Sequence, residues 1–426
     1  MNKLPKYPAY KPSGAKWLGE IPEHWETLAN KYIFNLKKNQ VGKKSGNYVL
    51  LSLTLNGVIK RDMVNPQGKF PADFDTYQEV KKGDFIFCLF DVEETPRTVG
   101  LSEYDGMITG AYTVMQPNDN FDRSYLYYFY LNLDADKRMK PLYTGLRNTI
   151  SKENFFSFRT FVPTLKEQTA IASFLDRKTT QIDQAIAQKE RMIELLKERR
   201  QILIHNAVTR GINPNVKMKD SGLEWIGKIP EHWELVSNRV LFDERNEPGN
   251  EDLPILSVSI HTAVSSEEIS DDENIRGKVR IEDKRSYKLV KVNDIAFNMM
   301  RAWQGGIGAV RVLGMVSPAY VVAKPIGPIN ADFFEYQYRT TSFIQQMDRN
   351  SKGITDFRKR LYWNEFKQLK TILPPIQEQE EIVLYIQTIE QKISTAISYK
   401  EKEIEKIKEY KTCLINEVVT GKIKVD

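Results

Sequence analysis

The sequence is poor in the residues that build metal sites and disulfide networks, and it lacks long apolar runs. Its 426 residues include only two cysteines and four histidines. Cys88 and Cys413 are far apart and show no metal-ligand or disulfide spacing, which suits a reducing compartment. The first residues lack the apolar core of a signal peptide, and no apolar run approaches the roughly 18 residues of a membrane span. We therefore expect a cytoplasmic protein without disulfides or membrane segments.

Catalytic signatures are also missing. The chain has no Walker loop, no Asn/Asp-Pro-Pro-aromatic methyltransferase motif and no Gly-x-Ser-x-Gly nucleophile motif. The glycine-rich segment 304–308 lacks the setting of a dinucleotide site and predicts a loop. Asp75, Glu79 and Lys81 resemble the acidic-plus-lysine cluster of metal-dependent nucleases, but a second copy of this segment has Leu289 in place of the glutamate. We expect no catalytic residue and no bound metal in this chain.

The composition is that of a globular protein with a mild basic excess. Apolar residues make up 41% and aromatic residues 11%, which argues against disorder. The length allows two or three domains, each with its own core. There are 62 lysines and arginines against 56 acidic residues, a formal net charge of +6. This charge permits a nucleic-acid partner without requiring one.

The strongest pattern is a long segment that occurs twice, at a constant offset of 211 residues that takes Pro163 to Pro374. Each copy opens with Pro-x-x-x-Glu-Gln and continues with apolar residues spaced alternately four and three apart. This heptad spacing over about four repeats predicts a helix that buries one narrow seam against another helix. The expected seam consists of Ile182, Ile186, Ile193, Leu196, Leu203, Ile393, Ile397, Ile404, Ile407 and Leu414.

Two copies of one seam most simply bury each other, so we expect one intramolecular pair of helices. The alternative is two unrelated amphipathic helices, which the matching flanking motifs disfavour. Cations interrupt both seams at equivalent places, Lys189 with Lys400 and Arg200 with Lys411. We expect their stems to lie along the seam with the charge in water, or to fix the register of the pair.

A second repeat lies ahead of each variable segment. Residues 13–26 recur as 221–234, and both copies contain Trp-x-Gly-x-Ile-Pro-x-x-Trp with a histidine before the last tryptophan. A histidine without a partner Cys, Asp or Ser motif is a poor catalyst, so we interpret this repeat as turns plus a small tryptophan-anchored core. Between the repeats, turn-plus-strand patterns and short aromatic helices recur in both variable segments, which predicts mixed domains of about 130 residues.

These boundaries divide the chain into six parts. They are an N-terminal conserved segment (1–26), a first variable domain (27–161), a central conserved helical region (162–211), a repeated conserved segment (212–234), a second variable domain (235–373) and a C-terminal conserved helical region (374–426).

Scattered basic, amide and aromatic residues in the variable segments are the candidates for nucleic-acid contact. Arginine and lysine suit phosphates and guanine edges, while asparagine and glutamine suit adenine. For any single residue, an ordinary solvated surface charge is the alternative. The densest cluster is residues 352–360, which combine four cations with a glycine loop. The full set is Lys43, Lys44, Arg61, Lys69, Arg97, Arg147 and Lys152, then Arg245, Asn298, Arg301, Trp303, Gln304, Lys352, Arg358, Lys359 and Arg360.

The arrangement of these motifs resembles one known family. Trp-x-Gly-x-Ile-Pro-x-x-Trp occurs twice, each time ahead of a variable segment that is closed by Pro-x-x-x-Glu-Gln and a long heptad helix ending in Val-Thr and glycine. Over essentially the whole chain this is similar to the specificity subunit of type I restriction–modification enzymes. One small departure is Arg210, which separates the threonine from the glycine in the first copy only.

The resemblance implies an α+β fold with two mixed α/β target recognition domains. A pair of long antiparallel coiled-coil helices would separate them, with an internal pseudo-twofold duplication. The family's role would be host defence: double-stranded DNA is read as a bipartite site, one half by each domain. Two methyltransferase (modification) subunits would dock on the helices and carry S-adenosylmethionine. Restriction subunits, with translocase and nuclease activity dependent on ATP and Mg, would join that core. The chain itself would be non-catalytic and bind no cofactor.

Three alternatives stay open at this point. A free-standing two-headed DNA-binding regulator would share the domains but need no methyltransferase. A coiled-coil adaptor that binds only proteins would show no salt-dependent DNA affinity. A fused, self-sufficient restriction enzyme is disfavoured by the absent methyltransferase motif and by the length.

Overall fold

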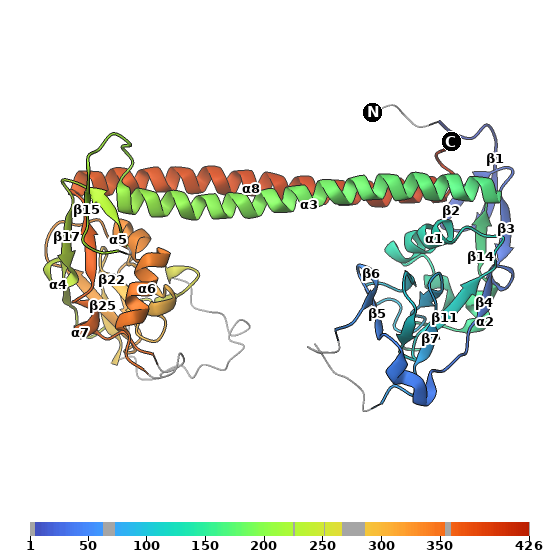
Figure 1. The fold of residues 1–426 in the computed structure, drawn as a ribbon, viewed down its shortest axis with the longest axis horizontal. Coiled ribbons are helices and arrows are strands. Elements are labelled where there is room, and N and C mark those ends of the chain that lie inside the picture. The colour runs from blue at the N-terminus through green and yellow to red at the C-terminus, as the bar shows by residue number, and fades with distance from the viewer. Residues whose placement is uncertain are drawn as a thin grey trace. The chain divides into compact units, whose positions relative to one another are not determined.

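The structure is a computed structural model that describes residues 5–62, 73–224, 226–250, 252–265, 286–353 and 359–425. It divides into two compact units: Met1–Lys189 with Glu401–Asp426, and Glu190–Lys400. We call them unit 1 and unit 2. Each unit contains one variable segment together with part of both long helices, α3 (Leu165–Arg210) and α8 (Ile376–Val419) (Figure 1). Among the described residues, no helix combines the length and the apolar character that crossing a membrane requires.

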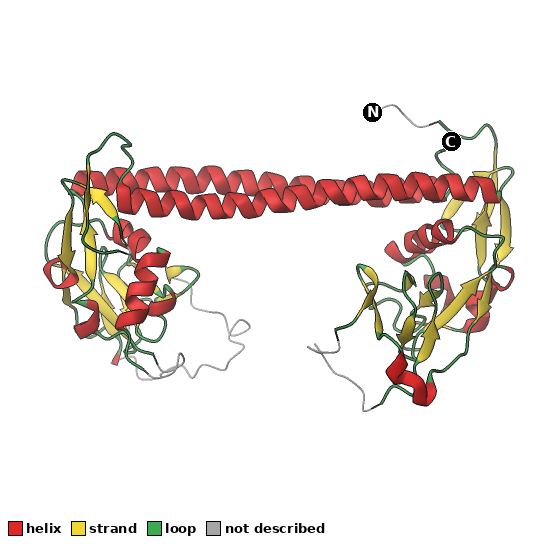
Figure 2. Cartoon of the chain, viewed as in Figure 1, coloured by secondary structure: helices red, strands yellow, loops and turns green. Residues whose placement is uncertain are grey.

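Unit 1 is built from short strands and a few helices (Figure 2). Its strands are β1 (Tyr10–Ala15), β2 (Leu18–Pro22), β3 (Glu26–Ala29), β4 (Phe34–Leu36), β5 (Leu51–Thr54), β6 (Gly57–Lys60), β7 (Gln78–Val80), β8 (Phe85–Phe87), β9 (Val99–Leu101), β10 (Gly106–Ile108), β11 (Thr113–Pro117), β12 (Tyr143–Thr144), β13 (Thr149–Ile150) and β14 (Arg159–Val162). Its helices, besides α3 and α8, are η1 (Asn30–Tyr32), η2 (Gly42–Asn47), α1 (Arg123–Ala135), η3 (Lys140–Leu142) and α2 (Lys152–Ser157).

Unit 2 repeats much of this order. Its strands are β15 (Met218–Asp220), β16 (Lys228–Pro230), β17 (Glu234–Ser237), β18 (Phe242–Glu244), β19 (Ser257–Ser259), β20 (Ala263–Ser265), β21 (Lys288–Val290), β22 (Ile295–Asn298), β23 (Ile307–Ala309), β24 (Gly314–Val316), β25 (Tyr320–Pro325) and β26 (Lys370–Leu373). Its other helices are α4 (Asn238–Leu241), η5 (Ala302–Gln304), α5 (Ala331–Tyr338), α6 (Thr341–Asn350) and α7 (Trp363–Phe366).

The same antiparallel sheet lies at the centre of each unit. The strand order is β4-β11-β8-β9 in unit 1 and β18-β25-β22-β23 in unit 2. The turn that enters β8 or β22 needs a positive φ, and the chain places Gly83 (φ +87°) and Asn293 (φ +73°) there, residue types that tolerate it. In each unit, the strand after the tryptophan repeat pairs with the strand before the long helix, β3 with β14 and β17 with β26. These pairs hold the two ends of each variable segment together.

Aromatic rings fill both cores. In unit 1 the rings of Phe87 and Phe155 are 4.7 Å apart, and in unit 2 those of Phe297 and Phe366 are 4.6 Å apart. A buried tyrosine completes each core: Tyr130 donates its hydroxyl to Asn30 Oδ1 at 2.7 Å, as its counterpart on α5 does to the equivalent asparagine at 2.8 Å. This pairing satisfies polar atoms that would be costly to bury alone.

The long helices pack against each other within unit 1. Lys189 Nζ lies 2.7 Å from Glu403 Oε2, and Lys411 Nζ lies 2.7 Å from Asp183 Oδ1. As the residue number on α3 falls, that of its partner on α8 rises, so the two segments run antiparallel. Two of the four cations predicted to interrupt the seam therefore pair across it.

The ten predicted seam residues are all buried or half-buried. The fully buried ones are Ile186, Ile193, Ile393, Ile404 and Leu414, and the half-buried ones are Ile182, Leu196, Leu203, Ile397 and Ile407. Both helices end near glycines with positive φ, +76° at Gly211 and +73° at Gly421, as the sequence predicts. The extra Arg210 of the first copy is the last residue of α3.

Candidate nucleic-acid interface

In unit 2, two loops that are distant in sequence form one surface. The first follows β22 and contains residues 299–304, and the second contains residues 352–353 and 359–361. Lys352 and Arg360 exchange backbone hydrogen bonds of 2.8 Å, and Leu361 N donates to Met299 O at 2.9 Å. We call this surface the unit 2 loop platform.

Cationic, amide and aromatic side chains meet on the unit 2 loop platform. The ammonium of Lys359 lies over the ring of Trp303, 5.2 Å from its centroid, a favourable cation–π distance. Arg301 Nη1 donates to Gln304 Oε1 at 2.7 Å. Arg360 Nη1 donates to the backbone carbonyl of Lys359 at 2.9 Å. The structure thus brings together predicted residues that are about 50 positions apart in the chain.

Carboxylates moderate part of this positive charge. Lys359 Nζ lies 2.7 Å from Asp348 Oδ1, and Lys352 Nζ lies 2.5 Å from Glu365 Oε1. Both lysines keep some exposure, 22% and 70% of the side chain. Because both ammonium groups still reach solvent, a phosphate can compete with the carboxylates for them.

Unit 1 contains an equivalent platform. Ile150 N donates to Leu89 O at 2.8 Å, the same pairing as Leu361 with Met299, and Asp91 N donates to Arg147 O at 2.9 Å. The side chain of Arg147 returns to Asp91, with Nε–Oδ1 at 3.0 Å and Nη2–Oδ2 at 2.5 Å. The hydrogen bond from Arg147 lowers the pKa of the Asp91 carboxyl. Arg147 remains 73% exposed, so its charge is accessible from solvent.

The remaining candidates of unit 1 take no part in the contact between Arg147 and Asp91. Lys43 and Lys44 are exposed on η2, and Lys152 is exposed at the start of α2. Arg97 is half-buried and donates from Nη2 to Leu55 O at 3.1 Å. Arg61 is half-buried. Two further candidates, Lys69 and Arg358, lie outside the described residues.

Arg245 and Asn298 support the fold around the unit 2 platform. Arg245 is 9% exposed, and its Nε and Nη2 donate to the Asp294 carboxylate at 2.8 and 3.1 Å, with a further contact to Glu247 at 2.5 Å. The hydrogen bond to Asp294 raises the pKa of Arg245. Asn298 Oδ1 accepts from Met300 N at 2.9 Å and shapes the turn. A guanidinium held in this way has little surface left for a ligand.

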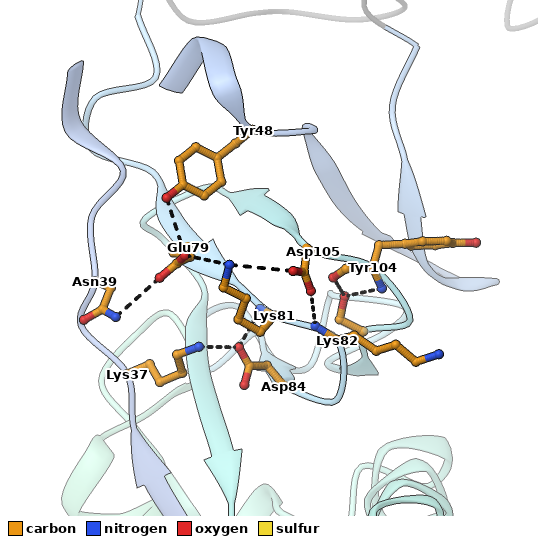
Figure 3. A network of polar contacts seen from close by, with 10 residues as sticks. Lys37, Asn39, Tyr48, Glu79, Lys81, Lys82, Asp84, Tyr104 and Asp105 are labelled. Atoms are coloured by element: carbon orange, nitrogen blue, oxygen red, sulfur yellow. Dashed lines mark hydrogen bonds and ion pairs between the residues drawn. The ribbon is translucent and has the colours of Figure 1, made fainter. Parts of the chain in front are cut away.

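The acidic-plus-lysine cluster of unit 1 is a set of ion pairs (Figure 3). Lys81 Nζ lies 3.0 Å from Glu79 Oε1 and 3.6 Å from Asp105 Oδ2. The hydrogen bond from Lys81 lowers the pKa of Glu79, which also accepts from Tyr48 and Asn39. Within the part of the chain that is described, no group of three or more His, Cys, Asp or Glu residues could hold a metal ion.

The repeated histidine and tryptophan anchor the conserved segment before each variable domain to the long helix that follows that domain. Glu167, in the first turn of α3, accepts from Trp25 Nε1 at 3.0 Å and from Tyr7 at 2.6 Å, and lies 2.9 Å from His24 Nε2. In unit 2, Glu378 of α8 accepts from Trp233 Nε1 at 2.8 Å and contacts the second histidine. Both tryptophans are 0% exposed. The sequence places both glutamates at the start of the long helices, in the repeated Pro-x-x-x-Glu-Gln motif, but does not reveal this contact.

Comparison with known proteins finds relatives that match nearly the whole chain. No family model matches. The putative type I restriction enzyme MjaX specificity subunit of Methanocaldococcus jannaschii is 24% identical over 433 residues, 96% of this chain and 96% of that protein. The type I restriction enzyme StySPI specificity subunit of Salmonella potsdam is 22% identical and covers 89% of this chain and 86% of its own length.

Solved structures show the same fold. The HsdS subunit from Thermoanaerobacter tengcongensis matches with a TM-score of 0.53 at 12% identity, over 95% of this chain and 98% of that one. A chain from work on the complex assembly and conformational transition of the type I R-M system matches with a TM-score of 0.61 at 12% identity, over 95% and 99%. The resemblance predicted from the motifs is confirmed: the relatives are type I specificity subunits, and the α+β fold with long helices is that of HsdS.

Proposed function

We propose that this chain is the specificity subunit of a type I restriction–modification complex and reads a bipartite site in double-stranded DNA. One observation carries the proposal: both units build the same loop platform, but with different side chains. Unit 1 presents Arg147 bound to Asp91, whereas unit 2 presents Arg301, Trp303 and Lys359. Two equivalent surfaces with unlike chemistry suit two unlike half-sites, because base edges are discriminated by the side chains that face them.

The long helices are the proposed docking surface for two modification subunits. Their sequence is duplicated, and two like segments can bind two copies of one partner. In this proposal methyl transfer belongs to the partners, which carry S-adenosylmethionine, while restriction subunits supply ATP- and Mg-dependent chemistry. The non-catalytic role of this chain is supported by its missing methyltransferase and nuclease motifs.

Sequencing that detects methylated adenine tests the proposal. Cells that carry the modification subunit are compared with and without this chain. We expect methylation at one bipartite motif only when both proteins are present, and none with either alone. Methylation by the chain alone would contradict the non-catalytic role. Sequence-specific DNA binding without any stable methyltransferase partner would favour the free-standing regulator instead.

A further inference from the structure

A polar cavity of about 760 Å³ lies within unit 2, and none of the loop platform residues described above lines it. It is lined by α3 and α8, by α5 and the start of α6, and by the turn between β19 and β20. Its volume is in the range of small-molecule sites, roughly 300–1,000 Å³. The groups that face it are two guanidinium groups, two imidazoles, hydroxyls and two carboxylates.

The first guanidinium belongs to Arg339, and backbone carbonyls fix it in place. Nη1 donates to Gly305 O at 3.0 Å, and Nη2 donates to Ile260 O at 2.9 Å and to His261 O at 3.2 Å. Carbonyl oxygens orient the guanidinium but carry no formal charge to neutralise it. Burial lowers the pKa of Arg339, while the charge of the nearby Glu335 acts in the opposite direction.

The second guanidinium belongs to Arg200 on α3. Its Nε is buried and has no hydrogen-bond partner among the described residues. The sequence repeat shows why. The repeat aligns Arg200 of α3 with Lys411 of α8, and Lys411 Nζ lies 2.7 Å from Asp183 Oδ1. The same repeat aligns Asp183 with Ser394, so a serine stands at the position where Arg200 would find its aspartate. The second copy of the helix therefore has a serine where the first copy has the aspartate that pairs with Lys411.

The two carboxylates at the cavity have other partners. Glu335 accepts from Ala309 N at 2.8 Å and lies 3.2 Å from Arg311, so its charge is already compensated. Glu390 accepts from Tyr336 at 2.8 Å. The cavity lining therefore contains two guanidinium groups and two carboxylates, and Arg311, which contacts Glu335, also pairs with Asp332 at 2.7 Å.

The histidines add hydrogen-bonding groups to the lining of the cavity. Burial and the nearby Arg210 lower the pKa of His205, so its imidazole is neutral at pH 7 and can donate or accept. In unit 1 the equivalent position is Asn416, which already accepts from Arg138 at 2.7 Å.

The corresponding cavity of unit 1 serves as an internal comparison. It is smaller, about 390 Å³, and is lined by the equivalent parts of α1, α3 and α8. Tyr130 and Tyr338 occupy equivalent positions, so the residue after each, Leu131 in unit 1 and Arg339 in unit 2, is equivalent as well. The counterpart of Arg200 in unit 1 is Lys411, which is paired with Asp183. The unit 1 cavity contains one guanidinium, that of Arg97, whose Nε is likewise buried without a hydrogen-bond partner among the described residues. A pair of guanidinium groups at one cavity is therefore what sets unit 2 apart.

We propose that the unit 2 cavity binds a phosphate or phosphate ester, held between the guanidinium groups of Arg200 and Arg339. Guanidinium groups bind phosphate oxygens through paired, charge-assisted hydrogen bonds, which suits an anion with several acceptors. The phosphate can come from a free small molecule or from the backbone of bound DNA. The chemistry at the cavity is the same in both cases.

Calorimetric titration of the full chain with pyrophosphate tests the proposal at constant ionic strength, with sodium chloride as the reference titrant. We expect saturable binding to the wild type. Arg200→Gln should weaken it about tenfold or more, because one charged hydrogen-bonding partner is lost. Ser394→Asp should weaken it to a similar degree by restoring the missing counter-charge while every cation is kept. Lys411→Gln removes the equivalent cation of unit 1 and should change the affinity by less than about twofold.

Adding a short DNA duplex distinguishes the two sources. If the backbone of DNA fills the cavity, pyrophosphate and DNA compete for it. In that case Arg200→Gln makes the fall of log affinity with log salt less steep, by about 0.9. If a free anion fills it, both ligands bind together and DNA affinity is unchanged in Arg200→Gln. Absence of saturable pyrophosphate binding would overturn the proposal. So would equal losses in Arg200→Gln and Lys411→Gln, or wild-type affinity in folded Ser394→Asp.

Discussion

Removing one carboxylate from the unit 2 loop platform should strengthen DNA binding. Asp348 lies 2.7 Å from the ammonium of Lys359, with 38% of its side chain exposed. If Lys359 binds a phosphate, the aspartate is about 5–6 Å from that phosphate and repels it. Coulomb's law in a water-like dielectric gives roughly 0.7 kcal/mol for two unit charges at that separation, which is about threefold in affinity. Asp348→Asn should therefore bind DNA about threefold more tightly at low salt.

The assay is fluorescence anisotropy of a labelled duplex with the chain and its modification subunits, from about 50 to 200 mM salt. Lys359→Ala should weaken binding about tenfold, since it removes the cation and leaves the aspartate unpaired. Glu194→Gln is the matched control: Glu194 pairs with Lys197 at 2.9 Å on α3, so the same charge is removed away from the platform. Unchanged or weaker binding by Asp348→Asn, together with wild-type binding by Lys359→Ala, would refute a phosphate contact at this lysine.

Two further predictions concern stability. Glu167→Gln should lower the free energy of unfolding by about 1–3 kcal/mol, because a charged acceptor for buried Trp25 and Tyr7 is lost. Urea denaturation measures this free energy, and an unchanged midpoint and slope would contradict the role of Glu167 in anchoring Trp25. The pKa of His205 in the folded chain lies below its ordinary value. As the pH drops below about 6.5, the unfolded chain therefore binds a proton at His205 before the folded chain does. The free energy of unfolding should fall over this range, until the pH passes the lowered pKa of the folded chain. His205→Asn should flatten that part of the pH profile relative to wild type, and an identical slope would contradict the assignment.

The periodic parts of the fold follow from the sequence alone. The seam residues and the glycine ends predict α3 and α8, because heptad spacing and positive-φ stops are local signals. The expected aromatic helices are present as α1 and α5, and the predicted turn-plus-strand pattern is present where Gly83 and Asn293 lead into β8 and β22. In each case neighbouring residues decide the structure.

The loop platforms do not follow from local pattern. The contact of Leu361 with Met299 joins segments about 60 residues apart, and nothing in either segment alone indicates its partner. For the same reason, Arg245 looks like a surface cation in sequence but is bound to Asp294, which is 49 positions away. The anchoring of Trp25 by Glu167 spans 142 positions. The duplication is the one signal that could have indicated such contacts, since equivalent pairs recur in both copies.

The most direct test of the central claim is an exchange of one variable segment. Residues 27–161 are replaced by the corresponding segment of another specificity subunit, and methylated adenines are mapped in cells that also carry the modification subunit. We predict a bipartite motif in which one half changes, while the half read by residues 235–373 stays the same. A motif altered in both halves, or one that does not change at all, would contradict the claim that each unit reads its own half-site.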